Sequence, residues 1–431
     1  MRVLTPDLAK KSALSPFTKG FQHQLKFQAI LSEASQLFNW QGSRATTLGE
    51  IAGALGLTKT CLYHYVKTKD DLIYQCYLAS CDMWLATAHR SNQSKGSGLE
   101  KVVCMVEDHF HRFVKTLKGE SACFAMLTEV SALTPAHGEE IRKRWKQIFG
   151  CCQSMVEEGM ADGSIAKVNP KVVTLAIFSV LQWSQVWFDR RHASNATYII
   201  GCVVDILAHG MAEKHHQFAS IRYPNSTDCH VDHFDKKLQN QMKREAFYRV
   251  GAQHFNYHGY KGTSLDGIAT ALHVTKGAFY HHISSKEELL YQCFKRSIAL
   301  ERGLLLAAGK TARTGLARLE LALRYLLHVQ HSDQGPLIRY RALPSLDEQH
   351  RKDILKNSKE NSALLGGYIN EGVERGSLRG IDAEVAQHLL SGAIEASPDL
   401  SDHVAYDNGL ELAADYLGVF VNGLSVQQKA R

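Results

Sequence analysis

Apolar residues recur three and four positions apart along most of this chain, which is the spacing of one face of an α-helix. They do so first between Lys26 and Trp40, where Gly42 follows as a typical helix end. The same spacing predicts further helices over residues 100–117, 123–133, 139–159, 170–190 and 195–211. No run of residues alternates in the manner of a β-strand, so the pattern predicts an all-α fold.

The stretch after the first helix predicts short helices that are separated by tight turns. Thr46 or Thr47 offers an N-cap hydroxyl, and Glu50, three positions after Thr47, completes a capping box. A glycine makes the next turn, Thr58 caps a third helix, and Lys69 opens a fourth.

This stretch occurs twice in the chain. TTLGEIAGALGLTKTCLYHYVKTKDDL at residues 46–72 aligns without a gap with TSLDGIATALHVTKGAFYHHISSKEEL at residues 263–289, at an offset of 275 − 58 = 217. Further on, EGMADGSIAKVNP at residues 158–170 matches EGVERGSLRGIDA at residues 371–383, at an offset of 371 − 158 = 213. The duplication therefore includes the longer helices as well as the short ones.

The segment between the two copies is polar and has little periodicity, which is typical of a linker. We therefore divide the chain into six parts: a basic N-terminal arm (residues 1–25), a first head (26–85), a first body (86–213), a linker (214–240), a second head (241–302) and a second body (303–431). The heads hold the short helices, and the bodies hold the longer ones.

The repeated pattern T-x-x-E-I-A-x-x-L-G-L-T-K-x-x-L-Y-H-Y-x-x-x-K-x-x-L resembles the DNA-binding domain of the TetR family of bacterial transcriptional regulators. The second copy resembles that domain equally well, and outside the two windows the likeness is only architectural. The resemblance implies a helix-turn-helix head, double-stranded operator DNA as partner, and a regulator that is most often a ligand-released repressor. It implies neither enzymatic activity nor a cofactor.

A helix that reads a major groove needs a polar N-terminal turn, and a helix start also attracts phosphate. We expect Lys59, Thr60 and Tyr63 to read bases, and Thr47, His64 and Lys69 to bind the backbone. The resemblance implies the phosphate-binding role of Lys69. The complete set of expected DNA contacts is Thr47, Thr58, Lys59, Thr60, Tyr63, His64 and Lys69, with Ser264, Thr275, Lys276, Gly277, Tyr280, His281 and Lys286 in the second head. Because the two reading helices differ, we expect a near-palindromic operator with unequal halves.

The resemblance also implies that the last two helices of each body form a four-helix bundle, as in the dimer of the family. Here residues 172–190 and 195–211 would pack against residues 383–396 and 407–424. One chain would then act as an intrachain pseudo-dimer. A homodimer of chains with four heads is the alternative.

Family bodies usually hold a small effector, and the first body is rich in aromatic side chains. The candidate ligand-binding residues are Phe110, Phe113, Phe124, Trp145, Phe149, Phe178 and Trp183. They suit a small apolar compound such as an acyl chain or an aromatic molecule, although aromatic stripes at helical spacing also form ordinary cores.

Composition and charge limit the possible partners and location of the protein, but they do not identify a reaction or a ligand. The net charge of +7 over 431 residues tolerates an anionic partner without requiring one. The most apolar segment, residues 172–188, is interrupted by polar side chains, so we expect no membrane association. Ten cysteines without a secretory signal indicate reduced thiols and a cytoplasmic protein.

Two alternatives remain open at this point. Metal or redox sensing would use Cys229-His230-x-x-His233, or Cys151-Cys152 with His109 and His111, but neither has the paired Cys-x-x-Cys spacing of a zinc site. We therefore assign no metal site. The other alternative is a helical ligand-binding protein or enzyme without DNA binding, although no phosphate loop or nucleophile elbow is present.

Overall fold

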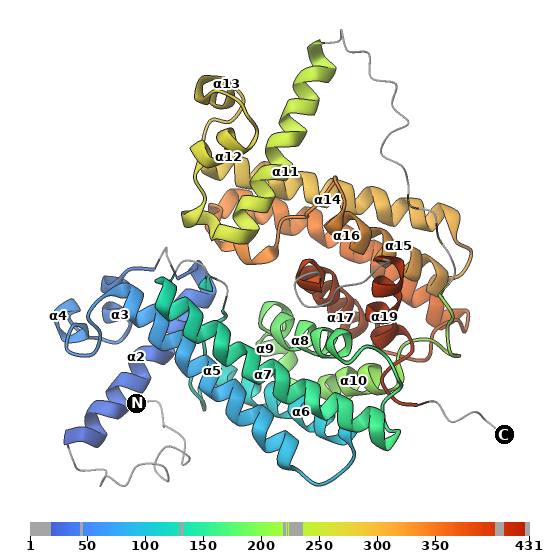
Figure 1. The fold of residues 1–431 in the computed structure, drawn as a ribbon, viewed down its shortest axis with the longest axis horizontal. Helices are drawn as coiled ribbons and strands as arrows, with labels where there is room; N and C mark the ends of the chain where they lie inside the picture. Colours follow the sequence, from blue (N-terminus) through green and yellow to red (C-terminus); the bar gives the residue numbers. More distant parts are fainter. Residues whose placement is uncertain are drawn as a thin grey trace. The chain divides into compact units, whose positions relative to one another are not determined.

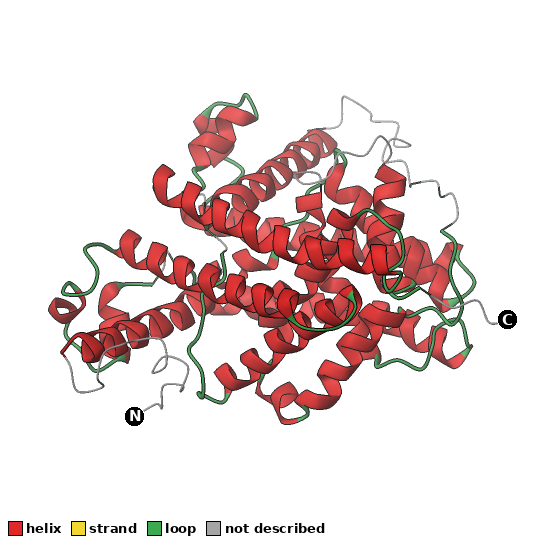
Figure 2. Ribbon diagram, turned by 60° about the horizontal axis from the view of Figure 1, so that its bottom comes forward, coloured by secondary structure: helices red, strands yellow, loops and turns green. Residues whose placement is uncertain are grey.

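The computed structural model describes residues 19–43, 46–127, 129–130, 133–218, 221, 223, 236–400 and 409–426. This part of the chain is helical (Figures 1 and 2), with one isolated antiparallel bridge between Ala212 and Leu378. The all-α prediction is confirmed. No helix within these ranges is long and apolar enough to cross a membrane.

The two halves of the chain contain corresponding helices. The first half has α2 (Lys19–Gln41), α3 (Leu48–Ala54), α4 (Lys59–Leu62), α5 (Lys69–Gln93), α6 (Gly98–Leu117), α7 (Pro135–Asp162), α8 (Pro170–Trp187), α9 (Arg190–Ser194) and α10 (Ala196–His209). The second half has α11 (Lys236–Gly262), α12 (Leu265–Ala271), α13 (Lys276–Tyr280), α14 (Lys286–Thr311), α15 (Gly315–His331), η2 (Tyr340–Ser345), α16 (Glu348–Glu374), α17 (Ala383–Ala396), η3 (Ser397–Asp399) and α19 (Gly409–Val421).

The chain divides into two compact units whose boundary does not coincide with the sequence repeat. Unit 1 comprises residues 1–165 and 184–204, and unit 2 comprises residues 166–183 and 205–431. The boundary crosses α8 and α10, so parts of both helices belong to unit 2. The Cys229, His230 and His233 candidates, and most of the predicted N-terminal arm, lie outside the described residues.

Local capping explains the short helices. Thr47 and Glu50 form the predicted capping box: Glu50 N donates to Thr47 Oγ1 over 3.1 Å, and Thr47 N donates to Glu50 Oε2 over 2.6 Å. The first helix is longer than predicted and begins at Lys19, because no proline lies between Lys19 and Lys26. The helix predicted over residues 170–190 ends at Trp187, because Asp189 caps the separate helix α9.

The helix predicted over residues 123–133 is wrong, because residues 121–127 are not helical. Side chains of α2 satisfy their backbone instead. Asn39 Nδ2 donates to Phe124 O over 2.9 Å, and Met126 N donates to Asn39 Oδ1 over 2.8 Å. The Asn39 amide thus supplies two of the hydrogen bonds that a helix would have made within the segment, and Ser32 Oγ accepts a third from Cys123 N over 2.9 Å.

The second half repeats this arrangement. Asn256, at 256 − 39 = 217, donates to Leu337 O over 2.8 Å and accepts from Arg339 N over 2.9 Å. In each half one asparagine therefore joins the first helix of the head to an extended segment of the body.

Within unit 2, Ala166, the end of α10 and the two residues Met211 and Ala212 exchange backbone hydrogen bonds with Arg379 and with the end of the second half. The donors and acceptors come in reciprocal pairs at an offset of 213, since 424 − 211 = 213 and 379 − 166 = 213. Met211 N donates to Phe420 O (3.0 Å), and its counterpart Leu424 N donates to Leu207 O (2.9 Å). Ala212 N donates to Val421 O (2.8 Å), and its counterpart Ser425 N donates to Ala208 O (2.8 Å). Ala166 N donates to Leu424 O (2.8 Å), and its counterpart Arg379 N donates to Met211 O (2.9 Å).

Gly210 and Gly423 occupy the centre of this exchange, since 423 − 210 = 213. A Cβ atom on Gly210 would lie 2.3 Å from the carbonyl carbon of Asn422, and one on Gly423 would lie 2.4 Å from Gly210 N. Both glycines also have positive φ, 72° and 79°. When each residue of one half repeats the contact of its counterpart in the other half, the contacts have the pattern of a two-fold symmetric interface. Here the interface joins two parts of one chain.

Candidate nucleic-acid interface

In the first head, a glycine turn and a buried anchor present the polar start of α4. Gly56 has φ 65°, and Thr58 accepts a hydrogen bond from Cys61 N over 3.3 Å as the N-cap of α4. Leu62 is fully buried and fixes the helix to the core of the head. Lys59 and Tyr63 point outward, and Tyr63 is 50% exposed although it is a large aromatic residue.

The starts of the neighbouring helices complete this surface. Thr47 caps α3 and is exposed, while Lys69, the first residue of α5, is half-buried. Hydrogen bonds from Thr47, followed by the charge of Lys69, lower the pKa of the Glu50 carboxyl. The cap of α3 and the lysine at the start of α5 therefore both act on Glu50.

The second head has the same construction. Thr275 caps α13 and accepts from Ala278 N over 3.3 Å, and Phe279 is fully buried where Leu62 is in the first head. Tyr280 is 49% exposed, which nearly equals the exposure of Tyr63. Because both tyrosines are exposed, packing in the core does not explain why each head has an aromatic residue at this position.

Lys286, at the start of α14, is held against the head itself. Its Nζ donates to Thr263 O over 2.9 Å and lies 4.9 Å from the centre of the Tyr260 ring. The ammonium is thereby oriented beside Ser264, which caps α12. In both heads the structure thus places a lysine near the start of the supporting helix.

The predicted DNA contacts occupy corresponding places in the two heads. All fourteen are exposed except the half-buried Lys69 and Lys286. They lie at the starts of α3, α4 and α5 or of α12, α13 and α14, or within one turn of the reading helix. Their individual roles in DNA binding remain predictions.

The sequence reading missed three differences between the heads. Lys276 forms a 2.5 Å ion pair with Asp266, whose counterpart is Gly49, since 266 − 49 = 217. This pairing raises the pKa of Lys276. His273 takes the place of Gly56 and has φ 55°, and Gly267 takes the place of Glu50. Comparing the aligned copies position by position would have found all three.

The aromatic candidates for a ligand site are divided between the two units. Phe110 is fully buried and packs on Phe188 at 5.5 Å, and Phe113 lies 6.1 Å from the same ring. Phe149 is buried, and Phe124 and Trp145 are half-buried in the same unit. Phe178 and Trp183 belong to unit 2. A ligand-binding role for this set remains a prediction.

The predicted cysteine and histidine alternative is not assembled around a metal in the described residues. Cys152 is fully buried, and burial raises the pKa of its thiol. His109 instead hydrogen bonds with Ser184 over 2.8 Å and stacks on Trp84 at 4.7 Å.

A different group was missed by the sequence reading. In the described chain, the donor atoms of Glu287, Asp347 and His350 all lie within 4.8 Å of one another. The hydrogen bond to Glu287 is the main reason why the pKa of His350 is raised. These residues come from the starts of α14 and α16, which lie 60 positions apart in sequence at Glu287 and Asp347.

Comparison with known proteins explains this geometry. Residues 30–76 and 248–293 each match the family described as bacterial regulatory proteins of the tetR family, and residues 95–211 match the tetracyclin repressor-like C-terminal domain. The chain belongs to the TetR family. This membership confirms the resemblance found in the sequence and makes the protein a DNA-binding transcriptional regulator with two TetR-type DNA-binding domains.

Individual relatives match one part of this chain. The TetC protein of transposon Tn10 from Escherichia coli is 25% identical over 139 residues, which cover 31% of this chain and 67% of TetC. The transcriptional repressor KstR2 from Mycolicibacterium smegmatis is 26% identical over 141 residues, which cover 31% of this chain and 65% of KstR2. The structure of AibR in complex with isovaleryl coenzyme A and operator DNA is 19% identical, covers 42% of this chain and 97% of AibR, and has a TM-score of 0.35.

Proposed function

We propose that this TetR-family protein is a single-chain pseudo-dimer whose two heads bind one operator and repress transcription until a small molecule releases it. The observation that carries the proposal is the set of reciprocal hydrogen bonds between the halves, centred on Gly210 and Gly423. In an ordinary homodimer such contacts join two identical chains. Here the linker keeps the two halves at high effective concentration for each other.

The arrangement of the heads supports the DNA part of the proposal. Tyr63 and Tyr280 are exposed to nearly the same extent, and each follows a capped helix start that carries a lysine. Helix starts and lysines bind phosphate, while side chains at the start of a reading helix contact base edges. We assign the base contacts to Lys59, Thr60 and Tyr63 and to their counterparts in the second head.

The effector is proposed to be a small apolar compound bound by the aromatic residues of the first body. The direction of regulation follows the repressor KstR2. The protein is proposed to act in the cytoplasm, where bacterial DNA lies. A homodimer of chains with four heads, and a helical ligand-binding protein without DNA binding, are the competing functions.

Selection of bound sequences from random duplex DNA tests the proposal. We expect an operator with two related but unequal halves, one for each head. Lys59→Ala should weaken binding about tenfold, which corresponds to about 1.4 kcal/mol, and should reduce the dependence on salt. Lys310→Ala, an exposed lysine in the last turn of α14, is the matched control and should leave affinity unchanged. Recovery of no preferred sequence would refute the proposal.

A further inference from the structure

The interiors of the two bodies differ in chemistry at corresponding positions. The first body has aromatic or apolar residues where the second has polar ones. At offsets of 217 in α14 and α15 and 213 beyond them, the pairs are Trp84 with Glu301, Phe113 with Gln330, Met126 with Arg339, Trp145 with Ser358, and Ile148 with Asn361. One duplicated body has therefore gained a carboxylate and hydrogen-bonding groups inside.

Glu301 has no cationic partner among the described residues. Its carboxylate accepts one hydrogen bond, from Asn361 Nδ2 over 3.0 Å. Asn361 is only 1% exposed, yet its Oδ1 has no hydrogen-bond partner. Buried polar atoms are rarely left unsatisfied, so this oxygen points to a group that the protein itself does not supply.

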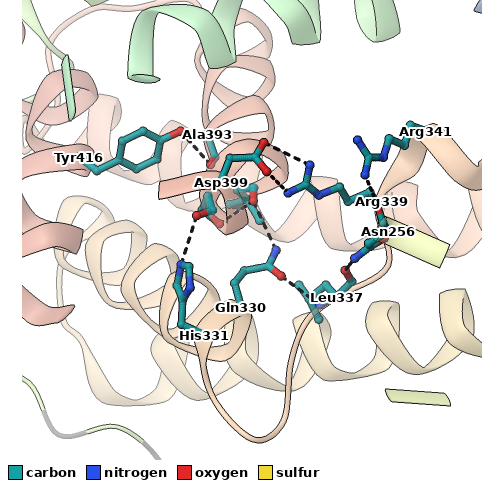
Figure 3. Close-up of polar contacts among 11 residues, drawn as sticks. Asn256, Gln330, His331, Leu337, Arg339, Arg341, Ala393, Asp399 and Tyr416 are labelled. Atoms are coloured by element: carbon teal, nitrogen blue, oxygen red, sulfur yellow. Dashed lines mark hydrogen bonds and ion pairs between the residues drawn. The ribbon is translucent and has the colours of Figure 1, made fainter. Parts of the chain in front are cut away.

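A second carboxylate lies on the other side of Tyr340. Glu395 Oε2 accepts from Tyr340 N over 3.2 Å, and the negative charges of Glu301 and Glu395 both act on the Tyr340 phenol. Arg341 acts on Glu395 through its positive charge, and so, more strongly, does Arg339. Arg339 is also bound to Asp399, with contacts of 2.5 and 3.2 Å (Figure 3).

Aromatic rings border the same cluster. The Trp183 ring lies 5.8 Å from the Tyr340 ring, and Phe294 lies 6.2 Å from it on another side. The buried Nε1 of Trp183 has no hydrogen-bond partner. Aromatic faces attract cations when the site is shielded from water.

Protein surrounds both carboxylates. Burial raises the pKa of Glu301 and of Glu395, although each residue as a whole keeps intermediate exposure. A carboxylate in such a place is costly unless a positive charge joins it.

We propose that Glu301, Tyr340, Asn361, Glu395 and Trp183 form a binding site for a small organic cation that carries an ammonium group. The cation would lie against the Tyr340 and Trp183 rings and compensate the carboxylate of Glu301, while Asn361 Oδ1 would accept its N–H or polar groups. The site does not favour a metal ion, because the metal-ligating set in the described chain lies elsewhere, at Glu287, Asp347 and His350. Only the interpretation of this cation as an effector rests on the proposed function.

Calorimetric titration of the full chain with benzyltrimethylammonium tests the site without DNA. Benzyl alcohol serves as the neutral probe and phenylacetate as the anionic one. We expect saturable binding of the ammonium compound, and binding of the other two at least tenfold weaker. Equal binding of the cation and the alcohol, or no binding of the cation, would overturn the proposal.

Glu301→Gln keeps the size of the side chain and removes its charge, and should weaken binding of the ammonium compound at least tenfold. Glu360→Gln is the matched control on α16, because Glu360 is an exposed partner of Arg302. If Glu301→Gln does not fold by circular dichroism, Glu395→Gln replaces it with the same expected direction. An unchanged affinity in a folded variant would contradict the site. A gel shift with the selected operator separates the two proposals, since cation binding without release of DNA would leave the site intact and refute only its role as an effector site.

Discussion

The two heads share the exposed lysine, tyrosine and histidine of the reading helix, Lys59, Tyr63 and His64 with Lys276, Tyr280 and His281, but differ in how their turns and caps are built. The first head has a capping box at Thr47 and Glu50 and a glycine in its turn, whereas the second has Gly267 and His273 at the matching positions. The second head adds an ion pair between Asp266 and Lys276 that the first lacks. The exposed lysine, tyrosine and histidine are the same in the two copies while the supporting positions differ, so we expect the two heads to contribute unequally to binding and to stability.

The contact between the halves shows the opposite behaviour. Its three reciprocal pairs of hydrogen bonds have stayed nearly equal in length on the two sides. This contrast teaches that backbone contacts around Gly210 and Gly423 allow little divergence, while the heads allow more.

The largest effect is expected at the centre of the exchange. Gly423→Ala places a methyl group 2.4 Å from backbone atoms of residues 209 and 210 in a left-handed conformation, and should lower the free energy of unfolding by about 3 kcal/mol. Denaturant titration measures this loss. Gly376→Ala is the control, because Gly376 has φ 69° but open space around it, and should cost only about 1 kcal/mol. Equal losses in the two variants would contradict a close contact at Gly423.

The asparagines that join head to body should matter unequally. Asn39→Ala should cost about 2 kcal/mol by thermal or denaturant unfolding, because it removes two hydrogen bonds to the extended segment. Asn256→Ala should cost less, since Ser297 and Gln330 also bind that segment in the second half. Gln153→Ala, on the surface of α7, is the control and should change stability by less than about 0.5 kcal/mol. A greater loss for Asn256→Ala would reverse this part of the comparison.

Exchanging the turn residues tests the stability of the heads. His273→Gly should raise the stability of the second head by up to about 1 kcal/mol, because glycine adopts positive φ without strain. Gly56→His should lower the stability of the first head by a similar amount. Hydrogen exchange of the α12–α13 and α3–α4 amides reports each head separately. Slower exchange in the first head after Gly56→His would be incompatible with this explanation.

The smallest effect is expected from the ion pair in the second head. Asp266→Gly removes the acidic partner of Lys276 and should tighten operator binding by about 0.5–1 kcal/mol, mainly at low salt. The reverse change, Gly49→Asp, should weaken binding through Lys59 by a similar amount. Fluorescence anisotropy with the selected operator measures both. Asp70→Gly, at the start of α5, controls for a general change in net charge. Tighter binding after Gly49→Asp would contradict the assignment.

Much of this structure follows from local rules that a sequence displays. Thr47 and Glu50 form their capping box because the interaction spans only three residues, and the repeat offset locates the second head directly. The extended segment at residues 121–127 could not be predicted, because the side chain that satisfies its backbone, Asn39, lies 85 positions away from Phe124. The cluster around Glu301 could not be predicted from the sequence for the same reason, since its residues come from several helices of the second half and from α8.

The mass of the operator complex tests the central claim most directly. Native mass spectrometry of the full chain with a duplex that contains both half-sites should give one 48.1 kDa chain per duplex, and each half-site alone should bind much more weakly. Two chains per duplex, with each half-site bound as tightly as the complete operator, would contradict a single-chain pseudo-dimer.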